Sequence, residues 1–403
     1  MNKVVRSSSS LLLIHATLLQ LSSFVVRPAA TYRALELNVS TAYIGLIAAS
    51  FAILPLFATF MIGRESDRGN NSRVLLNGSI LMLVVGFGLI LFSNSIEMIV
   101  FWVLLMGLGH MMSVVGQQAM IANARSSELD KAFGMYTFAG SLGQAIGPAL
   151  ILLSSGSSVI PDTWRLFLFY LIAVVLLLVT TLFLIQTPEV KIKVSVIVEE
   201  VKIKNLWSKV DVKFKPSLSV GMLVSLISIG SIDVLAIYLP AIGIDRGIPS
   251  ATIGILLSAR AIATMISRFH LARLSDYFGR NRLIIISTAL AGALMVAIAF
   301  PAPVLLLGFI IVLIGFTIGI SQPLTMTIIT LSAPLDSRGI WLSLRLAANR
   351  IGQAALPAAV GFTTVPLGTG AAFGSTGLLL IGVASISQKL LPASTDQKKD
   401  RSK

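Results

Sequence analysis

Long apolar stretches separated by short polar connections run through the whole chain. Many of these stretches reach the ~18 to 20 residues that a helix needs to cross the core of a bilayer. Only helices and closed barrels satisfy the backbone in lipid, and the sequence lacks the ~10-residue alternating strands of a barrel. The pattern therefore predicts twelve transmembrane helices, near residues 9–29, 41–62, 73–93, 97–121, 131–154, 164–186, 217–240, 251–269, 283–300, 303–331, 340–363 and 369–391.

A short polar loop occurs twice, at residues 63–68 and 272–277. Asp67 in the first copy and Asp276 in the second are 209 positions apart (276 minus 67). This period is far longer than the ~20 to 50 residues of solenoid and propeller repeats, so the chain is predicted to consist of two related halves. The same offset relates Arg64 to Arg273, Ser66 to Ser275, Arg73 to Arg282, Ile44 to Ile253, Gly143 to Gly352, Gln144 to Gln353 and Pro148 to Pro357.

The two halves are predicted to be bundles of six helices each, joined by a polar connection. Residues 187–216 mix lysine and glutamate with β-branched residues and are too polar to cross a membrane. The expected fold class is therefore all-α, with twelve transmembrane helices in two pseudo-symmetric bundles. We expect a first bundle at residues 1–186, a cytoplasmic linker at 187–216, a second bundle at 217–392 and a cytoplasmic tail at 393–403.

The composition indicates an integral membrane protein without catalytic chemistry. Hydrophobic residues make up 55% of the sequence and charged residues 12%, and the mean hydropathy is +0.90, which leaves too little polar surface for a soluble globule. The sequence contains no cysteine, and its three histidines lack metal-ligand spacing, so neither a metal nor another cofactor is expected. No nucleophile and base stand at a credible catalytic spacing, which argues against an enzyme.

The formal net charge of +14 raises the question of an acidic partner such as nucleic acid. The basic residues gather in alternate polar connections, including seven lysines between positions 191 and 215. The positive-inside rule assigns these connections, and both termini with them, to the cytoplasm. Membrane topology alone thus explains the excess charge, and no nucleic acid is expected as a partner. The expected location is a bacterial inner membrane.

Each of the two polar loops matches part of the pattern G-x-x-x-D-R/K-x-G-R/K-R/K. The first has Asn70 at the second glycine, and the second begins with Ala272 instead of glycine. With two copies of this loop in one register and twelve predicted spans, the chain resembles the major facilitator superfamily of secondary transporters over essentially its whole length. Within that family it resembles the branch of drug and metabolite exporters. The residues that carry the resemblance are Gly63, Asp67 and Arg68 in the first loop, and Asp276, Gly279 and Arg280 in the second. The repeat adds Arg73, Arg273 and Arg282 as further candidates for the conformational role of these loops.

The resemblance implies that these loops act as a latch on the cytoplasmic face in one conformational state. A carboxylate beside fixed guanidinium groups and helix N-termini is physically suited to such a contact. The alternative is that the charges only anchor the topology.

The predicted fifth helix contains glycines at 140, 143 and 147 followed by a proline, and this pattern resembles the antiporter motif G-x-x-x-G-P of the superfamily. Small residues four apart let helices approach closely, and a proline loosens the backbone hydrogen bonding. The resemblance implies export by antiport, but the same spacing also serves plain helix packing, and uniport and symport stay open. The residues concerned are Gly143, Gly147 and Pro148, with Gly352 and Pro357 at equivalent positions in the second half.

Polar residues inside the predicted spans are the candidates for a substrate and proton cavity. A charge at mid-bilayer costs roughly 2.5 to 3.5 kcal/mol on insertion scales, so such a group usually faces a cavity or a partner. The resemblance implies that the first, fourth, seventh and tenth helices line this cavity. Asp233 and Arg260 are alternatively a structural ion pair. The candidates are His15, His110, Ser113, Gln117, Asp233, Arg260, Gln322, Arg345, Asn349 and Arg350.

These observations predict a transporter that works by alternating access around a site between the halves. The expected cargo is a small amphipathic or anionic organic molecule exported against protons; the alternatives are a proton-linked importer and a non-transporting receptor. His110 is the predicted proton carrier, because a histidine has an ordinary pKa of about 6.5 and this one shares a helix face with Ser113 and Gln117. The other titratable candidates inside the spans are Asp233 and His15. The expected partners are the substrate, protons and lipid, and the protein is expected to be a monomer.

Overall fold

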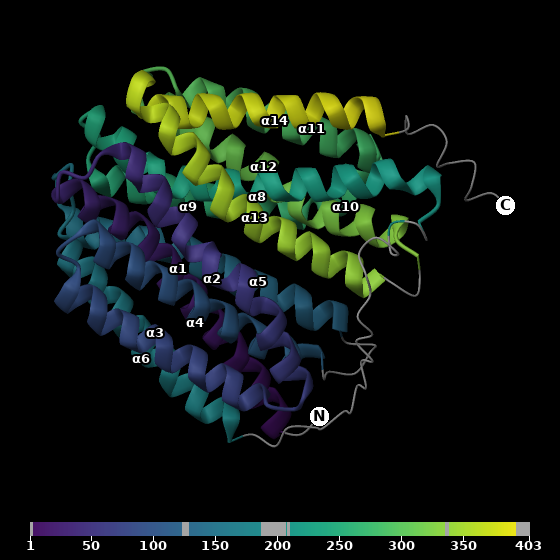
Figure 1. Cartoon of the computed structure of the whole chain (residues 1–403), viewed down its shortest axis with the longest axis horizontal. Coiled ribbons are helices and arrows are strands. Elements are labelled where there is room, and N and C mark those ends of the chain that lie inside the picture. Colours follow the sequence, from purple (N-terminus) through teal and green to yellow (C-terminus); the bar gives the residue numbers. More distant parts are fainter. Residues whose placement is uncertain (1–2, 123–128, 187–206, 208–209, 335–337, 392–403) are drawn as a thin grey trace. The chain divides into compact units, whose positions relative to one another are not determined.

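The computed structural model describes residues 3–122, 129–186, 207, 210–334 and 338–391 (Figure 1). Within these ranges the regular structure is helical, and no strand is assigned. The chain forms two compact units, the first made of Met1–Val196 with Ala236–Ile262 and the second of Ile197–Leu235 with Ala263–Lys403.

The first unit contains six complete helices. Helix α1 packs against α5 and α6, while α3 packs against α4 and α6, and α2 lies against α4 (Figure 1). The long apolar runs of the sequence thus meet one another along their length. The helices are α1 (Lys3–Glu36), α2 (Thr41–Asp67), α3 (Asn71–Phe92), α4 (Ile96–Ala122), α5 (Leu129–Ser155) and α6 (Thr163–Ile185).

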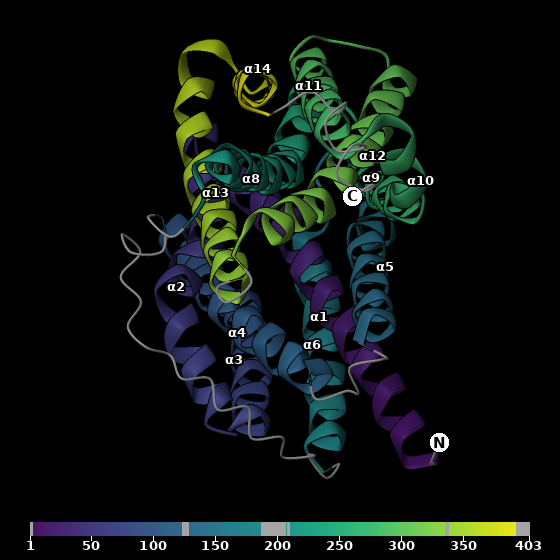
Figure 2. The same cartoon turned by 90° about the vertical axis from the view of Figure 1, so that its right-hand side faces the viewer.

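The second unit contains the remaining helices, and its boundary with the first unit falls inside α8 and α9. Helix α11 packs against α12 and α14, and α13 also contacts α14 (Figure 2). The elements are the short 3₁₀ helix η2 (Val212–Phe214), α8 (Lys215–Asp245), α9 (Ser250–Phe269), α10 (Leu271–Phe278), α11 (Arg280–Ile298), α12 (Val304–Ser332), α13 (Arg338–Leu367) and α14 (Gly370–Leu390).

Each of the twelve predicted spans coincides with a helix, so the predicted all-helical fold is confirmed. Among the described residues, eleven helices are long and apolar enough to cross a membrane. Helix α13 has the length, with 30 residues, but it is not one of the eleven. Its first half contains three arginines that lower its hydropathy: Arg338, Arg345 and Arg350.

The repeat seen in the sequence is also present in the packing of each unit. A Cβ atom on Gly143 of α5 would lie 2.2 Å from the carbonyl oxygen of Thr17 on α1. A Cβ atom on Gly352 of α13 would lie 2.1 Å from the carbonyl oxygen of Leu226 on α8. Thr17 and Leu226 are themselves 209 positions apart (226 minus 17). Equivalent glycines thus allow equivalent helix pairs to make backbone contact.

The predicted domain boundaries stay a prediction. Most of the expected linker, at 187–206 and 208–209, and almost all of the expected tail, at 393–403, lie outside the described residues. The described end of the linker packs with the second unit, because the ring of Trp207 lies 5.5 Å from that of Trp341 on α13, centroid to centroid. Val210 joins the same apolar cluster as Trp341.

Candidate functional site

A buried group of polar side chains lies among five helices of the first unit. His15 on α1 is at its centre: its Nε2 lies 2.8 Å from Thr181 Oγ1 on α6, and its Nδ1 lies 2.6 Å from Gln117 Nε2 on α4. Tyr136 on α5 donates a hydrogen bond of 2.9 Å to Gln117 Oε1. Ser79 Oγ on α3 lies 2.7 Å from Thr181 Oγ1. We call these five residues the His15 cluster.

The hydrogen bonds of the His15 cluster define the proton positions on the imidazole. An amide nitrogen only donates, so Gln117 Nε2 donates to Nδ1 of His15, which therefore accepts. In the neutral ring the proton then resides on Nε2 and is donated to Thr181 Oγ1. The Thr181 hydroxyl also lies 2.9 Å from the carbonyl oxygen of Leu177. A neutral His15 thus has both ring nitrogens satisfied without any charged neighbour in the cluster.

His110, the predicted proton carrier, lies in a different group of side chains in the same unit. Gln20 Nε2 donates to His110 Nε2 over 3.3 Å, and Gln144 Nε2 donates to Gln20 Oε1 over 3.4 Å. The His110 ring packs against Phe51 with 5.3 Å between centroids, and the Arg27 guanidinium lies 4.2 Å from the centroid of the same phenyl ring. His110 is therefore next to a buried cation rather than in the His15 cluster.

The predicted stripe of His110, Ser113 and Gln117 does not act as one polar face. Ser113 packs against α3 at Gly78, where a Cβ atom would lie 2.7 Å from the serine oxygen. Its hydroxyl is buried and has no hydrogen-bond partner among the described residues. The three side chains of the stripe thus lie in three separate environments.

A second buried polar group lies within the second unit. Arg345 Nη1 on α13 donates to Ser225 Oγ on α8 and to Gln322 Oε1 on α12, each over 3.1 Å. Ser225 Oγ donates to Asn349 Oδ1 over 2.6 Å, and Gln322 Nε2 donates to the Ser225 carbonyl oxygen over 3.3 Å. We call these four residues the Arg345 cluster. Three of them were predicted from the sequence, and the structure brings all three together.

Arg350, also predicted, lies apart from this cluster. It donates a hydrogen bond of 2.9 Å from Nη1 to Gln353 Oε1 on the same helix. Asp233 on α8 and Arg260 on α9 are both buried, with 2% and 3% of their surface exposed. The two predicted roles of these residues, a structural ion pair or membership of the site, both stay predictions.

The first of the two polar loops follows the end of α2 at Asp67, whose side chain lies outside the described residues. Glu65 accepts hydrogen bonds from Asn70 Nδ2 over 2.5 Å and from Arg68 Nη1 over 3.3 Å. These bonds, that from Asn70 first, hold the pKa of the Glu65 carboxyl below its ordinary value. Gly69, with φ of 85°, supplies the left-handed residue of the turn. The missing glycine at Asn70 is therefore replaced by a glycine one position earlier.

The second polar loop is largely a helix, which corrects the expectation of a loop at 272–277. Helix α10 carries Arg273 and Asp276, both exposed, and Asp276 forms no hydrogen bond or ion pair with any described residue. Gly279, with φ of 76°, separates α10 from α11. The first turn of α11 then holds the two remaining basic residues predicted for this loop, Arg280 and Arg282. The latch, which also involves Gly63 and the exposed Arg73, stays a prediction.

The glycine and proline motif of α5 lies against α1. A Cβ atom on Gly147 would lie 2.8 Å from the carbonyl oxygen of Leu21, so this glycine, like Gly143, allows close packing. Pro148 lies inside α5, and Pro357 lies inside α13. The geometry supports helix packing directly, while the implied link to antiport stays a prediction.

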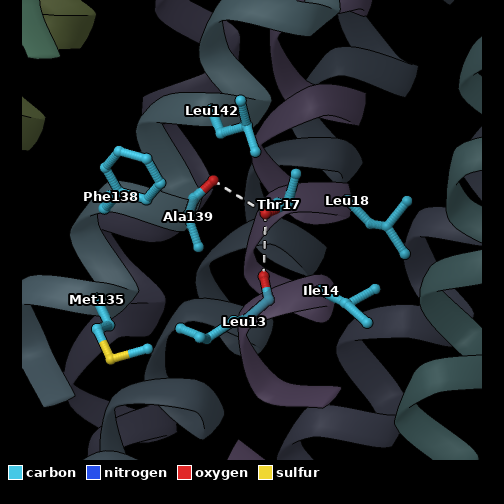
Figure 3. A pocket seen from close by; sticks show the side chains of 8 residues that line it. All are labelled: Leu13, Ile14, Thr17, Leu18, Met135, Phe138, Ala139 and Leu142. Carbon is cyan, nitrogen blue, oxygen red and sulfur yellow. Dashed lines mark hydrogen bonds between the residues drawn. The ribbon is translucent and has the colours of Figure 1, made fainter. Parts of the chain in front are cut away.

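An apolar groove of about 570 Å³ lies between α1 and α5 (Figure 3). Thr17 contributes its one polar side chain, and the Thr17 hydroxyl lies 3.0 Å from the carbonyl oxygens of both Leu13 and Ala139. The groove therefore offers shape and apolar contact but no charged group to orient a substrate. The lining residues are Leu13, Ile14, Thr17, Leu18, Met135, Phe138, Ala139 and Leu142.

Sequence reasoning missed several members of the two clusters. The sequence gives no signal for Ser79, Thr181 and Ser225, because serine and threonine often bond only to their own helix. Tyr136 had a usable signal, because it occupies the position equivalent to Arg345 in the repeat (345 minus 136 is 209). Applying the repeat offset to every candidate would have found it.

Comparisons with known proteins agree with this architecture. Among solved structures, a D-xylose-proton symporter is similar with a TM-score of 0.79 and 16% identity, over 98% of this chain and 99% of that chain. The nucleoside transporter NupG gives a TM-score of 0.72 and 14% identity, over 97% and 99%. A POT family transporter in complex with 5-aminolevulinic acid gives 0.71 and 16%, over 95% and 96%. At these identities the likeness shows the fold alone. The comparison with curated proteins gave no match.

A family model decides the assignment. The Major Facilitator Superfamily model matches residues 12–214 and 221–403, which is nearly the whole chain. Members of this family are transporters rather than enzymes, and the protein is an integral membrane protein with multiple passes. The polar clusters therefore lie inside the bundles of a transporter. The chain belongs to the Major Facilitator Superfamily of secondary transporters.

Proposed function

We propose that this transporter exports a small amphipathic or anionic organic molecule and couples that movement to protons. The observation that carries the proposal is the His15 cluster, in which a titratable ring without exposed surface joins four other helices. Among the ordinary side chains histidine has the pKa nearest to physiological pH, so a histidine at the junction of five helices is the candidate proton carrier. The resemblance of the glycine and proline motif of α5 to the antiporter motif of the superfamily supports the outward direction.

Protonation of His15 changes the contacts between helices. A proton on Nδ1 would face the amide nitrogen of Gln117, which is also a donor. The Gln117 amide must then turn over, so that its oxygen accepts from Nδ1 and its nitrogen donates to the Tyr136 oxygen. The contacts that α1, α4 and α5 make through these side chains thus depend on the charge of one ring. This coupling is what a proton-driven transporter requires.

His110 is the other candidate for the proton carrier, as the sequence predicts. Gln20 Nε2 donates to its Nε2, so the proton of the neutral His110 ring resides on Nδ1. The Arg27 guanidinium packs on the same Phe51 ring as His110, so protonation of His110 would place a second positive charge beside that ring. We therefore favour His15 over His110.

Import with protons is a second candidate function. The similar D-xylose-proton symporter is named for that reaction, and its fold matches this chain closely. Antiport and symport differ in the direction of proton movement when a substrate gradient is imposed. The close packing at Gly143 and Gly147 serves either mechanism.

The test uses purified protein in proteoliposomes that contain a pH-sensitive dye. Xylose, uridine, succinate and 5-aminolevulinic acid are each added outside, and the internal pH is followed. We expect an anionic solute to move protons in the parent protein, outward for antiport and inward for symport. His15→Gln should reduce this movement to background while His110→Gln retains it. Proton movement retained in His15→Gln and lost in His110→Gln would identify His110 as the carrier, and no movement with any solute would refute proton coupling.

We further propose that the protein resides in a bacterial inner membrane as a monomer, with both termini in the cytoplasm. The lysine-rich residues 191–215 and the basic polar loops support this orientation. A cysteine introduced at Lys389 should react with an impermeant maleimide only after the cells are opened, because the parent sequence contains no cysteine. Labelling of this cysteine in intact cells would contradict the proposed orientation and place the end of α14 outside the cell.

A further inference from the structure

Arg345 holds a buried positive charge that no described carboxylate balances. Only 7% of its surface is exposed. Its hydrogen bonds go to the neutral oxygens of Ser225 and Gln322. Within the part of the chain that the structure describes, no carboxylate lies within ion-pair distance of this guanidinium. Burying an unbalanced charge is costly, and inside membranes such residues commonly mark a functional site.

One edge of the Arg345 guanidinium makes no hydrogen bond to a described residue. Nη1 makes both hydrogen bonds to the protein, and Nε is buried without an acceptor among the described residues. Nη2 likewise donates to no described residue. The edge formed by Nε and Nη2 presents two parallel N–H groups, which match the two oxygens of a carboxylate.

We propose that the Nε and Nη2 edge of Arg345 binds the carboxylate of the transported molecule. This inference rests on the proposed transport of a small anionic molecule and names its charged group. Binding forms two charge-assisted hydrogen bonds and supplies the missing negative charge at once. A carboxylate fits better than a phosphate, because a phosphate has further oxygens for which the cluster offers few donors.

The other members of the cluster hold the arginine in place. Ser225 gives its proton to Asn349 Oδ1 and can therefore only accept from Arg345. Gln322 is fixed at its other end, where Nε2 donates to the Ser225 carbonyl oxygen. Three helices of the second unit thus orient one guanidinium, and a preorganised donor binds an anion more tightly than a flexible one.

The cluster also has a consistent depth within the second unit. Ser225 lies ten residues after the start of α8, Gln322 lies ten residues before the end of α12, and Arg345 lies seven residues after the start of α13. At 1.5 Å per residue these positions are ~10 to 15 Å from the helix ends. The cluster thus lies away from the helix termini, where a substrate carboxylate could balance the arginine charge.

The experiment measures thermal unfolding of the purified full chain in detergent with acetate, succinate or phenylacetate. Their neutral amides, acetamide, succinamide and phenylacetamide, are the matched probes, and sodium chloride keeps the ionic strength constant. Sodium phosphate tests the other common oxyanion. We expect at least one carboxylate to raise the Tm as its concentration rises, while its amide and phosphate do not.

Three variants locate the effect. Arg345→Gln should weaken the apparent carboxylate affinity at least about tenfold, which corresponds to ~1.4 kcal/mol. Arg345→Lys keeps the charge but loses the fork, so it should bind weakly and lose the preference for carboxylate over phosphate. If the Arg345→Gln protein does not fold, the Arg345→Lys protein still tests whether the guanidinium binds the carboxylate. Lys389→Gln removes one exposed positive charge from α14 of the same unit and should bind like the parent.

Several results would overturn the assignment. These are equal shifts with carboxylate and amide, a larger shift with phosphate, or undiminished carboxylate binding in both Arg345 variants. Absence of any shift in the parent would do the same. Binding in detergent needs no proton gradient, so proteoliposomes that move no protons would refute the proposed coupling and leave the Arg345 site standing.

Discussion

The two units place different chemistry on equivalent helices. The His15 cluster uses α1, α4 and α5, and the Arg345 cluster uses their counterparts α8, α12 and α13. Tyr136 in the first cluster stands where Arg345 stands in the second. Ser113, which packs against α3, stands where Gln322 completes the second cluster (322 minus 113 is 209). The repeat has kept the close helix contacts and exchanged the polar groups.

This difference suggests a division of labour between the units. The His15 cluster is neutral and contains a ring that can take up a proton. The Arg345 cluster carries a charge that persists at every physiological pH, because a guanidinium is not deprotonated in proteins. Proton coupling should therefore depend on the first unit and recognition of the substrate charge on the second.

The largest expected effect is that two variants each lose a different function: His15→Gln loses proton movement, and Arg345→Gln loses carboxylate binding. His15→Gln should reduce proton movement in proteoliposomes to background while the carboxylate-induced rise in Tm persists. Arg345→Gln should lose that rise, and the transport of anionic solutes with it. A His15→Gln protein that loses carboxylate binding while its folding is intact would show that the two functions are not divided between the units.

Next in size is the effect of a methyl group at the two glycine contacts. Gly143→Ala and Gly352→Ala each force a Cβ atom against a backbone carbonyl, so each should lower the free energy of unfolding by ~1 to 3 kcal/mol. Thermal or denaturant unfolding in detergent measures this change. Gly140→Ala is the control, because its nearest neighbour, Gln20 Cγ, lies 3.5 Å from the added atom. Equal stability of Gly140→Ala and Gly143→Ala proteins would contradict the packing argument.

A smaller effect should distinguish the two polar loops. Asp67→Asn should reduce transport several-fold and change the accessibility of cysteines introduced at the cytoplasmic face, as a latch requires. Asp276→Asn should change both less, because Asp276 is exposed and pairs with no described residue. Unchanged transport and accessibility in Asp67→Asn would leave the loop with a topological role only.

The smallest expected effect is a pH dependence of stability at Glu65. The folded state lowers the pKa of this carboxyl, so its contribution is present above the pKa of the unfolded chain and is lost as the pH falls through the folded value. The Tm difference between the parent and Glu65→Gln should therefore shrink on acidification. A difference that grows at acidic pH would show that Asn70 and Arg68 do not stabilise the ionised carboxyl.

The sequence predicted the helices well because a membrane imposes a length and an apolar composition on each span. Helix α13 is the exception by composition, and one of the arginines that make it less apolar, Arg345, is the centre of the polar cluster in the second unit. The turn after α2 shows another limit: Gly69 supplies the left-handed residue although the motif places the glycine at position 70. The glycine of this turn can therefore stand one position earlier than the motif requires, and a comparison with the motif alone does not predict this.

Side-chain partners were harder to predict, because periodicity gives the face of a helix but not what that face meets. Ser113 and Gln117 share a face of α4, yet one packs against Gly78 and the other bonds to His15. His15 was a candidate from its position alone, while Thr181 and Tyr136, which complete its surroundings, come from helices expected to contribute little. Only the crossing of five helices brings these groups together.

The contact between Trp207 and Trp341 gives the second unit an intrinsic optical reporter. The chain has four tryptophans, and these two indoles are packed at 5.5 Å with 37% and 2% of their surfaces exposed. An aqueous quencher such as iodide reaches the first ring and is excluded from the second. If the other two tryptophans are replaced by phenylalanine, the remaining fluorescence comes from Trp207 and Trp341. Its quenching would then report, without an attached dye, whether Trp207 stays packed on the start of α13 or leaves it.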